Sequence, residues 1–356
     1  MKKTMKVLMT ASAFIGVIVG AGFASGQEVL QYFTSFGLPG IFAVLISTVI
    51  FAYIGMMLVW LGSKAQTTSY NTVIYKISHF KVVGILVDCV LVFTLFGVGV
   101  VMIAGAGANL NQQFGVPHII GAVLMAVLVM LTGMLKVNKV IAVISSITPF
   151  LIIFVIIISI YSFVTMDSSL TDLNETAQSH GPFFPNWFIA GLNYAAFNTS
   201  VGAAMSIVMG SAEKDGRTAA LGGLVGGLGL GALILLSYFA IFSKIEEVGH
   251  LEMPMLGIVN DISPVLGIIM AVVIFGMIFN TAISMFFAFV SRFIPVETKR
   301  FNIVLAVTLI VGLLLSGIGF TDLVSHFYGA IGYMGLLLII VLIITAFRFK
   351  KIKFDE

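Results

Sequence analysis

Charged residues are scarce in this sequence, making up 9% of its 356 residues against roughly 25% in soluble domains. Hydrophobic residues make up 60% of the chain. The 18 basic and 15 acidic side chains are too few to cover the surface of a water-soluble protein of this length. The composition therefore indicates an integral membrane protein.

Cysteine is almost absent, and Cys89 alone allows neither an internal disulfide nor a cysteine-clustered metal site. The sequence contains no zinc-protease motif, nucleophile elbow or nucleotide-binding fingerprint, so we expect no enzyme activity and no cofactor. The glycine-rich stretch at 222–231 lacks the Gly-Lys-Ser/Thr ending of a phosphate loop and is typical of close helix packing. Basic residues lie at the edges of apolar runs, which gives nucleic-acid binding no support.

Long apolar runs fill most of the chain. A helix that crosses the bilayer needs about 20 apolar residues, and the runs are continuous, not alternating as in a β-barrel. The sequence predicts a single all-α transmembrane domain over 1–356 with ten spans, near 7–33, 38–62, 83–110, 117–135, 138–163, 186–210, 217–243, 263–291, 300–318 and 326–348.

Lysine and arginine predict the orientation of these spans. If the N-terminus is cytoplasmic, 17 of the 18 basic residues fall on the inside, and only Lys244 is left outside. The long outer connectors instead carry acidic residues such as Asp167 and Glu252. This pattern predicts a cell-membrane protein with both termini in the cytoplasm.

The N-terminal segment also resembles a signal peptide, with Lys2, Lys3 and Lys6 before an apolar run and small residues near Ala24. Cleavage there would leave nine spans. The charge pattern fits both alternatives, but removal of the first span would destroy the internal symmetry described next, so we favour the ten-span interpretation.

Two blocks of five spans, about 7–163 and 186–348, have similar length. An odd number of spans in each block forces the second block into the opposite orientation, as in inverted-repeat transporters. The segments at 20–26 and 195–202 correspond, since each places small residues, a phenylalanine, a serine and a glycine in the middle of a span.

These two segments favour breaks in the first and sixth spans. Glycine lowers helix stability, and Ser, Thr and Asn side chains compete with the helical hydrogen bonds. Backbone groups freed inside a membrane must line a cavity or meet a ligand. Freed amides attract an anion and freed carbonyls a cation, which predicts a site for a zwitterion or for a substrate with a coupling ion. The alternative is close packing of two unbroken helices through small residues.

The nonamer Gly20-Ala21-Gly22-Phe23-Ala24-Ser25-Gly26-Gln27-Glu28 closely resembles the first-helix signature of the YkvI-like bacterial membrane proteins. That group is similar to the amino acid–polyamine–organocation (APC) superfamily, whose LeuT-type fold is a 5+5 inverted repeat. The resemblance covers essentially the whole chain. It implies a transporter whose substrate lies between helices 1, 3, 6 and 8.

The resemblance and the two segments together give a set of candidate substrate contacts. They are Gly22, Phe23, Ala24, Ser25, Gly26, Phe96, Phe197, Asn198, Thr199 and Ser200.

The resemblance also implies a sodium site between the broken part of helix 1 and hydroxyl groups of helix 8. Ala21 would contribute from the break, and Thr281 and Ser284 would contribute oxygen ligands, which suit a hard cation. Asn280 shares a face with Ser284 but departs from the family pattern, in which a hydroxyl or small residue is more usual. The alternative is that these side chains bond to their own helix.

Glu28 and Asp88 are the two acidic residues inside predicted spans. A carboxylate at membrane depth is costly, which makes Glu28 a candidate for taking up a coupling proton or meeting a substrate amine. The alternative is a hydrated position near the outer mouth. Asp88 lies about two turns from the cytoplasmic edge and is interpreted as an interfacial or gate residue.

The sequence thus predicts a secondary transporter for a small organic solute, an amino acid or related zwitterion, driven by sodium or protons through alternating access. The expected partners are this solute and the lipid bilayer. An ion channel or a non-transporting membrane sensor is the alternative, although ten asymmetric spans fit a multi-subunit pore less well.

Overall fold

The computed structural model of the protein describes residues 3–66, 70–78, 80–134, 148–166, 168–296 and 298–347. This described part is helical throughout and contains no strand. Its α-helices are α1 (Lys3–Ile18), α2 (Ala21–Ser25), α3 (Gln27–Tyr32), α4 (Gly40–Ala65), α5 (Tyr70–Ile77), α6 (Lys81–Phe114), α7 (His118–Gly133), α9 (Thr148–Val164), α10 (Leu170–Ser179), α11 (Trp187–Ser211), α12 (Gly216–Ser243), α13 (Ile245–Val248), α14 (Pro254–Ile262), α15 (Pro264–Ser291), α16 (Lys299–Ser316), α17 (Phe320–Asp322) and α18 (Gly329–Phe347). A 3-10 turn, η1 (Thr34–Phe36), follows α3, and a π-helical stretch, η2 (Leu323–Tyr328), joins α17 to α18.

Six of the described helices are long and apolar enough to cross a membrane: α4, α6, α12, α15, α16 and the continuous run Phe320–Phe347. Two further apolar helices, His118–Gly133 and Ile152–Val164, are shorter. The prediction of an all-α membrane protein is confirmed, whereas the count of ten spans and the repeat boundaries stay predictions.

Some residues that entered these predictions lie outside the described part of the chain. They are 138–147 of the predicted fifth span, the basic residues Lys2, Lys136, Lys139, Arg348, Lys350, Lys351 and Lys353, and the acidic residue Asp167.

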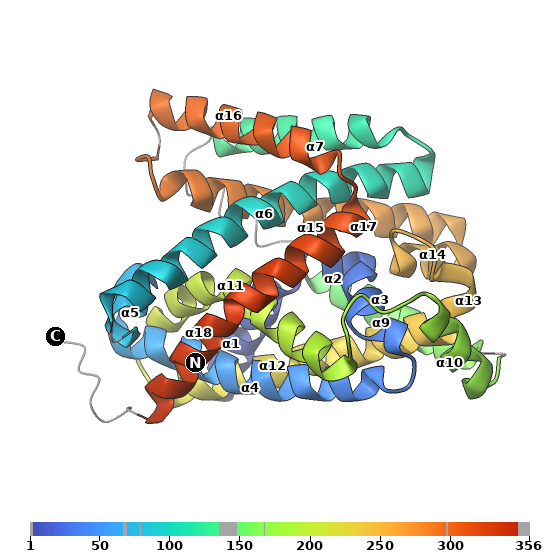
Figure 1. The fold of residues 1–356 in the computed structure, drawn as a ribbon, viewed down its shortest axis with the longest axis horizontal. Helices are drawn as coiled ribbons and strands as arrows, with labels where there is room; N and C mark the ends of the chain where they lie inside the picture. Colours follow the sequence, from blue (N-terminus) through green and yellow to red (C-terminus); the bar gives the residue numbers. More distant parts are fainter. Residues whose placement is uncertain are drawn as a thin grey trace.

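The helices form two packed groups. In one group α4 packs along α11 and α12, with α1 against α12 and α18 against α11. In the other, α6 packs on α7 and α15, and α16 contacts α6 and α7. Figure 1 shows α6, α7, α15 and α16 together in the upper part of the view, with α4, α11 and α12 below them. The short helices α2 and α3 contact members of both groups, so the first span lies between them.

Glycines let the backbones of the first group touch. A Cβ on Gly55 of α4 would lie 2.5 Å from the carbonyl oxygen of Gly223 in α12, and a Cβ on Gly227 would overlap the Phe51 carbonyl. Small residues are the usual means by which membrane helices approach closely. The interpretation of the glycine-rich stretch as a packing surface is therefore confirmed at these positions.

The first span is broken, as the glycine-rich nonamer predicts. Helix α1 ends at Ile18, α2 begins at Ala21, and Gly26 separates α2 from α3 with φ +84°. This left-handed conformation is open to glycine at little cost. The break therefore depends on glycine at position 26.

The predicted break in the sixth span is wrong, because α11 runs unbroken from Trp187 to Ser211. The side chains of Asn198, Thr199 and Ser200 donate to the carbonyls four residues earlier, at 3.2, 2.6 and 3.1 Å. These bonds supplement the helical ladder and do not replace it. The 195–202 segment also has only one glycine, whereas the 20–26 segment has three.

We predict that Gly227→Ala destabilises the protein while Gly229→Ala on the same helix does not. A Cβ at position 227 meets the backbone of α4, but a Cβ at position 229 lies 3.0 Å from the end of the flexible Ile15 side chain. Overpacking against backbone costs about 1–3 kcal/mol, more than the gain of about 1 kcal/mol in helix propensity. Thermal unfolding in detergent tests this, and equal melting temperatures for both variants would contradict it.

Candidate functional site

The turn at Gly26 is held by short-range hydrogen bonds and by packing from two other helices. The Ser25 hydroxyl donates to the Gly22 carbonyl at 3.0 Å and accepts from the Gln27 amide at 3.3 Å. A Cβ on Gly26 would lie 2.7 Å from the Met255 side chain of α14, so α14 covers this turn closely. The break is therefore an ordered structure inside the protein.

Glu28 folds back across this break. Its side chain is buried, with 4% of its surface exposed, and a Cβ on Gly22 would overlap its carboxylate. Among the residues that the structure describes, Glu28 is the one buried acid, and no lysine, arginine or histidine is buried. An ionised carboxylate in this setting costs several kcal/mol unless a positive charge meets it. The predicted alternative of a hydrated outer position is therefore wrong.

Three fully buried tyrosines surround Glu28. The Tyr194 hydroxyl lies beside the Glu28 carboxyl, and Tyr32 and Tyr328 lie close enough to interact with it electrostatically. Tyr32 lies four residues after Glu28, a spacing that places both on one helix face, so the sequence carried a signal for it. Tyr328 comes from the far end of the chain, and no sequence pattern indicates it.

The structure brings some of the predicted substrate contacts together and separates others. Gly22 and Gly26 form the break, and Phe197 stacks on Tyr328 with ring centroids 4.1 Å apart. Phe23, Ala24 and Ser25 are buried within the same segment, and Asn198 and Thr199 are buried on α11.

Two predicted contacts point elsewhere. A Cβ on Gly335 would lie 2.5 Å from the Ser200 hydroxyl, so Ser200 faces α18. Phe96 lies between α6 and α15, where its ring centroid is 5.4 Å from that of Phe289. It lines a separate cavity with Asp88 and Arg292.

Of the predicted ion-coupling residues on α15, Thr281 lies beside the start of α2. A Cβ on Gly20, the residue before Ala21, would be 3.7 Å from the Thr281 hydroxyl oxygen. The Thr281 and Ser284 hydroxyls donate to Met277 and Asn280 carbonyls at 3.1 and 2.8 Å. A hydroxyl that donates its proton keeps its lone pairs, so both oxygens remain able to ligate a cation. Asn280 is buried on the same helix.

The connector that contains α13 and α14 is fastened over one side of the break. Gln112 of α6 donates to the Met253 carbonyl and accepts from the Met253 amide, both at 2.9 Å, and His118 of α7 pairs with Glu252 at 2.9 Å. On the same side Gln31 donates to the Thr321 carbonyl at 3.2 Å. These contacts join segments far apart in the sequence and could not be predicted from it.

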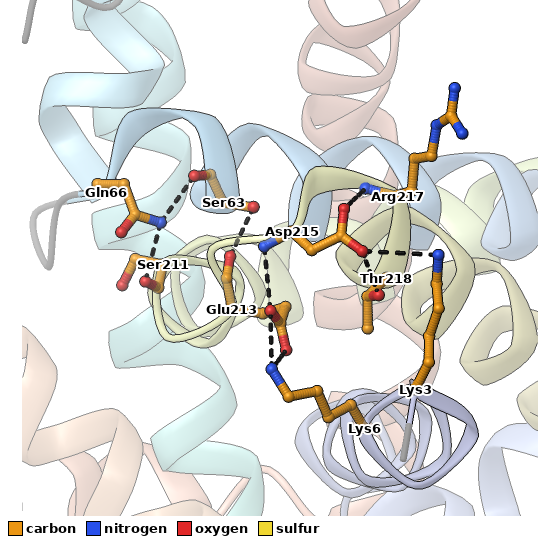
Figure 2. A network of polar contacts seen from close by, with 9 residues as sticks. All are labelled: Lys3, Lys6, Ser63, Gln66, Ser211, Glu213, Asp215, Arg217 and Thr218. Carbon is orange, nitrogen blue, oxygen red and sulfur yellow. Dashed lines mark hydrogen bonds and ion pairs between the residues drawn. The ribbon is translucent and has the colours of Figure 1, made fainter. Parts of the chain in front are cut away.

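At the opposite end, a polar network ties α1 to the connector between α11 and α12 (Figure 2). Lys6 pairs with Glu213 at 2.9 Å and Lys3 with Asp215 at 3.6 Å. The Ser63 hydroxyl of α4 donates to the Glu213 carbonyl at 2.6 Å. Lys3 and Lys6, which the positive-inside rule places on the cytoplasmic side, thus also fasten α1 to the first helix group.

Comparisons with known proteins agree with this architecture. The chain is 28% identical over 330 residues to the membrane protein YkvI of Bacillus subtilis (strain 168), covering 92% of each chain. It is 23% identical to YyaD of the same organism, covering 93% of this chain and 94% of YyaD. No family model matches the chain. The resemblance to YkvI that the nonamer indicates is thus confirmed.

Solved structures are similar over nearly the whole chain. MhsT in complex with L-phenylalanine gives a TM-score of 0.60 at 17% identity, covering 93% of this chain and 87% of MhsT. Mhp1 in an inward-facing conformation gives 0.63 at 16% identity, covering 94% and 75%. A Na⁺-coupled sialic acid symporter gives 0.58 at 14% identity, covering 94% and 79%. The fold is therefore the LeuT-type fold.

We predict that Glu213 contributes stability that acid removes. The Asp215 amide and then the Lys6 ammonium lower the pKa of Glu213 below its usual value of 4.5. Because the pKa is lowered on folding, the contribution is present above about pH 4.5 and is lost as the pH falls through the lower folded value. A partly exposed pair of this kind is worth about 1 kcal/mol at most.

The test compares the melting temperatures of wild type and Glu213→Gln in detergent from neutral to acid pH. The wild type should melt higher at pH 7, by about 1–3 °C, and the difference should vanish well below the usual pKa of a glutamate. Lys6→Met should lose only part of the effect, since the Asp215 amide still bonds Glu213. A difference that persists or grows in acid would refute this role of Glu213.

Proposed function

We propose that the protein is a secondary active transporter that moves an amino acid or a related zwitterion across the cell membrane by alternating access. The observation that carries the proposal is Glu28, a carboxyl buried at a helix break without a buried basic residue among the described residues. A purely structural role would leave this costly group unexplained. The LeuT-type fold supports the proposal, since MhsT holds L-phenylalanine and the sialic acid protein is a Na⁺-coupled symporter.

The substrate is proposed to lie at the break between α2 and α3. Its ammonium group would meet the Glu28 carboxylate, and its remaining groups would contact Gly22, Phe23, Ala24, Ser25 and Gly26. Phe197, Asn198 and Thr199 would close the site from α11. The proposed set leaves out Ser200, which faces α18, and Phe96, which packs against Phe289.

The coupling ion is proposed to act at one of two places. A proton would bind Glu28 and neutralise it when no substrate amine is present. A sodium ion would lie between Thr281, Ser284 and the backbone of Ala21, where oxygen ligands of the kind that hard cations prefer are close to the break. Asn280 would support this site from the neighbouring turn.

The membrane orientation follows the positive-inside rule, with both termini in the cytoplasm. The Lys3–Asp215 and Lys6–Glu213 pairs then lie on the cytoplasmic side, and the α13–α14 connector lies outside. The two helix groups would rock about the break, exposing it to one side at a time.

Uptake of radiolabelled amino acids into proteoliposomes tests the function. We expect concentrative uptake that depends on an imposed sodium gradient or an imposed pH gradient, applied separately. Passive leakage in every arm, across the full panel of amino acids, would contradict transport.

The sodium arm has a matched control pair. Thr281→Ala removes a hydroxyl beside the break, whereas Thr308→Ala removes a hydroxyl on α16 that is bonded to its own helix in the same way, at 2.7 Å from the Val304 carbonyl. If sodium drives uptake, only Thr281→Ala should raise the half-maximal sodium concentration, by about tenfold for one lost ligand.

We predict that Glu28→Gln uncouples or abolishes transport. Glutamine keeps the shape of the side chain but neither binds a coupling proton nor neutralises an ammonium group. With proton coupling, exchange of substrate persists while the pH gradient loses its effect. With amine recognition, substrate affinity falls about tenfold or more, because a charge-assisted hydrogen bond is lost.

Glu175→Gln, an exposed change of the same chemistry on α10, serves as the control and should behave as wild type. Unchanged rate, affinity and pH dependence in Glu28→Gln would remove Glu28 from the mechanism.

A further inference from the structure

A second polar position lies far from the break, in a cavity of about 670 Å³ between α6 and α15. Asp88 and Cys89 of α6 and Arg292 of α15 line it together with four phenylalanine rings. Charged groups with aromatic walls are typical of sites that bind a small molecule with a polar head and an apolar body.

Asp88 and Arg292 are paired in this cavity, but each still has hydrogen-bonding groups that the other does not use. One guanidinium nitrogen of Arg292 donates to Asp88 Oδ2, while Asp88 Oδ1 is buried and has no hydrogen-bond partner among the described residues. Arginine has further N–H groups beyond the one used here. The pair therefore keeps capacity for one more acceptor and one more donor.

This combination selects a zwitterion. A ligand with only a positive or only a negative charge would be attracted by one member of the pair and repelled by the other. A zwitterion can place its ammonium against Asp88 and its carboxylate against Arg292. A guanidinium group favours a carboxylate that accepts two parallel N–H bonds from it. The phenylalanine rings, Phe96 and Phe289 among them, would then cover an aromatic or large aliphatic side chain.

The position of the cavity connects it with the break. Arg292 follows Thr281 by eleven residues, which is three helical turns, so both lie on the same face of α15 about 16 Å apart along the axis. Thr281 lies beside Gly20 at the break. In the orientation proposed above, the cavity lies on the cytoplasmic side of the break, close to the start of α6 and the end of α15.

We propose that the cavity is a second, inner binding site for an amino acid with an aromatic or large aliphatic side chain, held by Asp88 and Arg292. It rests on the proposed function, because it serves the solute between the break and the cytoplasm.

Cys89 gives a direct test, since it is the one cysteine of the chain, is exposed and lines the cavity. The experiment measures the rate at which N-ethylmaleimide alkylates Cys89 in the full-length purified protein, by mass spectrometry, with L-phenylalanine as the probe. L-phenylalanine at ten times its dissociation constant should slow alkylation about tenfold. Phenethylamine and phenylacetate, which each lack one charged group, should protect much less.

Two sets of variants make the result specific. Asp88→Asn and Arg292→Gln should each raise the half-protecting concentration about tenfold or more, and Glu28→Gln should leave it unchanged. Cys89→Ser combined with Val82→Cys moves the thiol to an exposed position on the same helix outside the cavity, where L-phenylalanine should not protect.

Absence of protection in a protein that transports amino acids would overturn the inner site and leave the proposed function standing. Loss of protection in Glu28→Gln but not in Arg292→Gln would also overturn it, since the probe would then act from the break. Protection by phosphatidylethanolamine but not by L-phenylalanine would assign the cavity to a lipid headgroup. Absence of uptake for every solute would instead refute the proposed function.

Discussion

The contact between the Glu28 carboxylate and Gly22 fixes the geometry on which the centre of this protein depends. It requires a residue without a Cβ at position 22 and a left-handed turn at Gly26, where the short helix α2 ends and the chain folds back. The carboxylate is then enclosed by tyrosines from α3, α11 and η2, with no buried basic residue among the described residues. In the proposed mechanism, a coupling proton or a substrate amine neutralises this carboxylate.

The helix group around α4 and α12 is tightly packed beside the break, whereas the group around α6 and α15 contains a cavity. Backbone contacts at Gly55, Gly223 and Gly227 join α4 to α12 without intervening side chains, and such contacts tolerate little deformation. The Lys6–Glu213 pair adds α1 to the same unit. On the α6 and α15 side, large phenylalanine rings border a cavity. Two such groups, hinged at a broken helix, meet the mechanical requirement of alternating access.

Much of this could be predicted from the sequence, because composition, span length and glycine spacing act locally. The break at Gly26 follows from three glycines in one short segment, and the packing role of Gly223 and Gly227 from their spacing of four. The break expected at 195–202 failed because the same polar residue types can bond to their own helix, and only the structure tells which they do. Tyr328, Met255 and Glu213 could not be predicted as partners of the site or of α1, since each meets a segment more than 200 residues away in the chain.

The unbroken α11 changes what each half of the protein contributes to the site. With two broken helices, freed backbone groups from both halves would share in binding a ligand. Here the first span alone supplies such groups, and α11 contributes side chains, above all Tyr194 and Phe197. In the proposed site, polar recognition is then concentrated on Glu28 and on the hydroxyls of α15, while α11 supplies shape. The proposed inner site differs in this respect, because Asp88 and Arg292 would meet both charges of a zwitterion there.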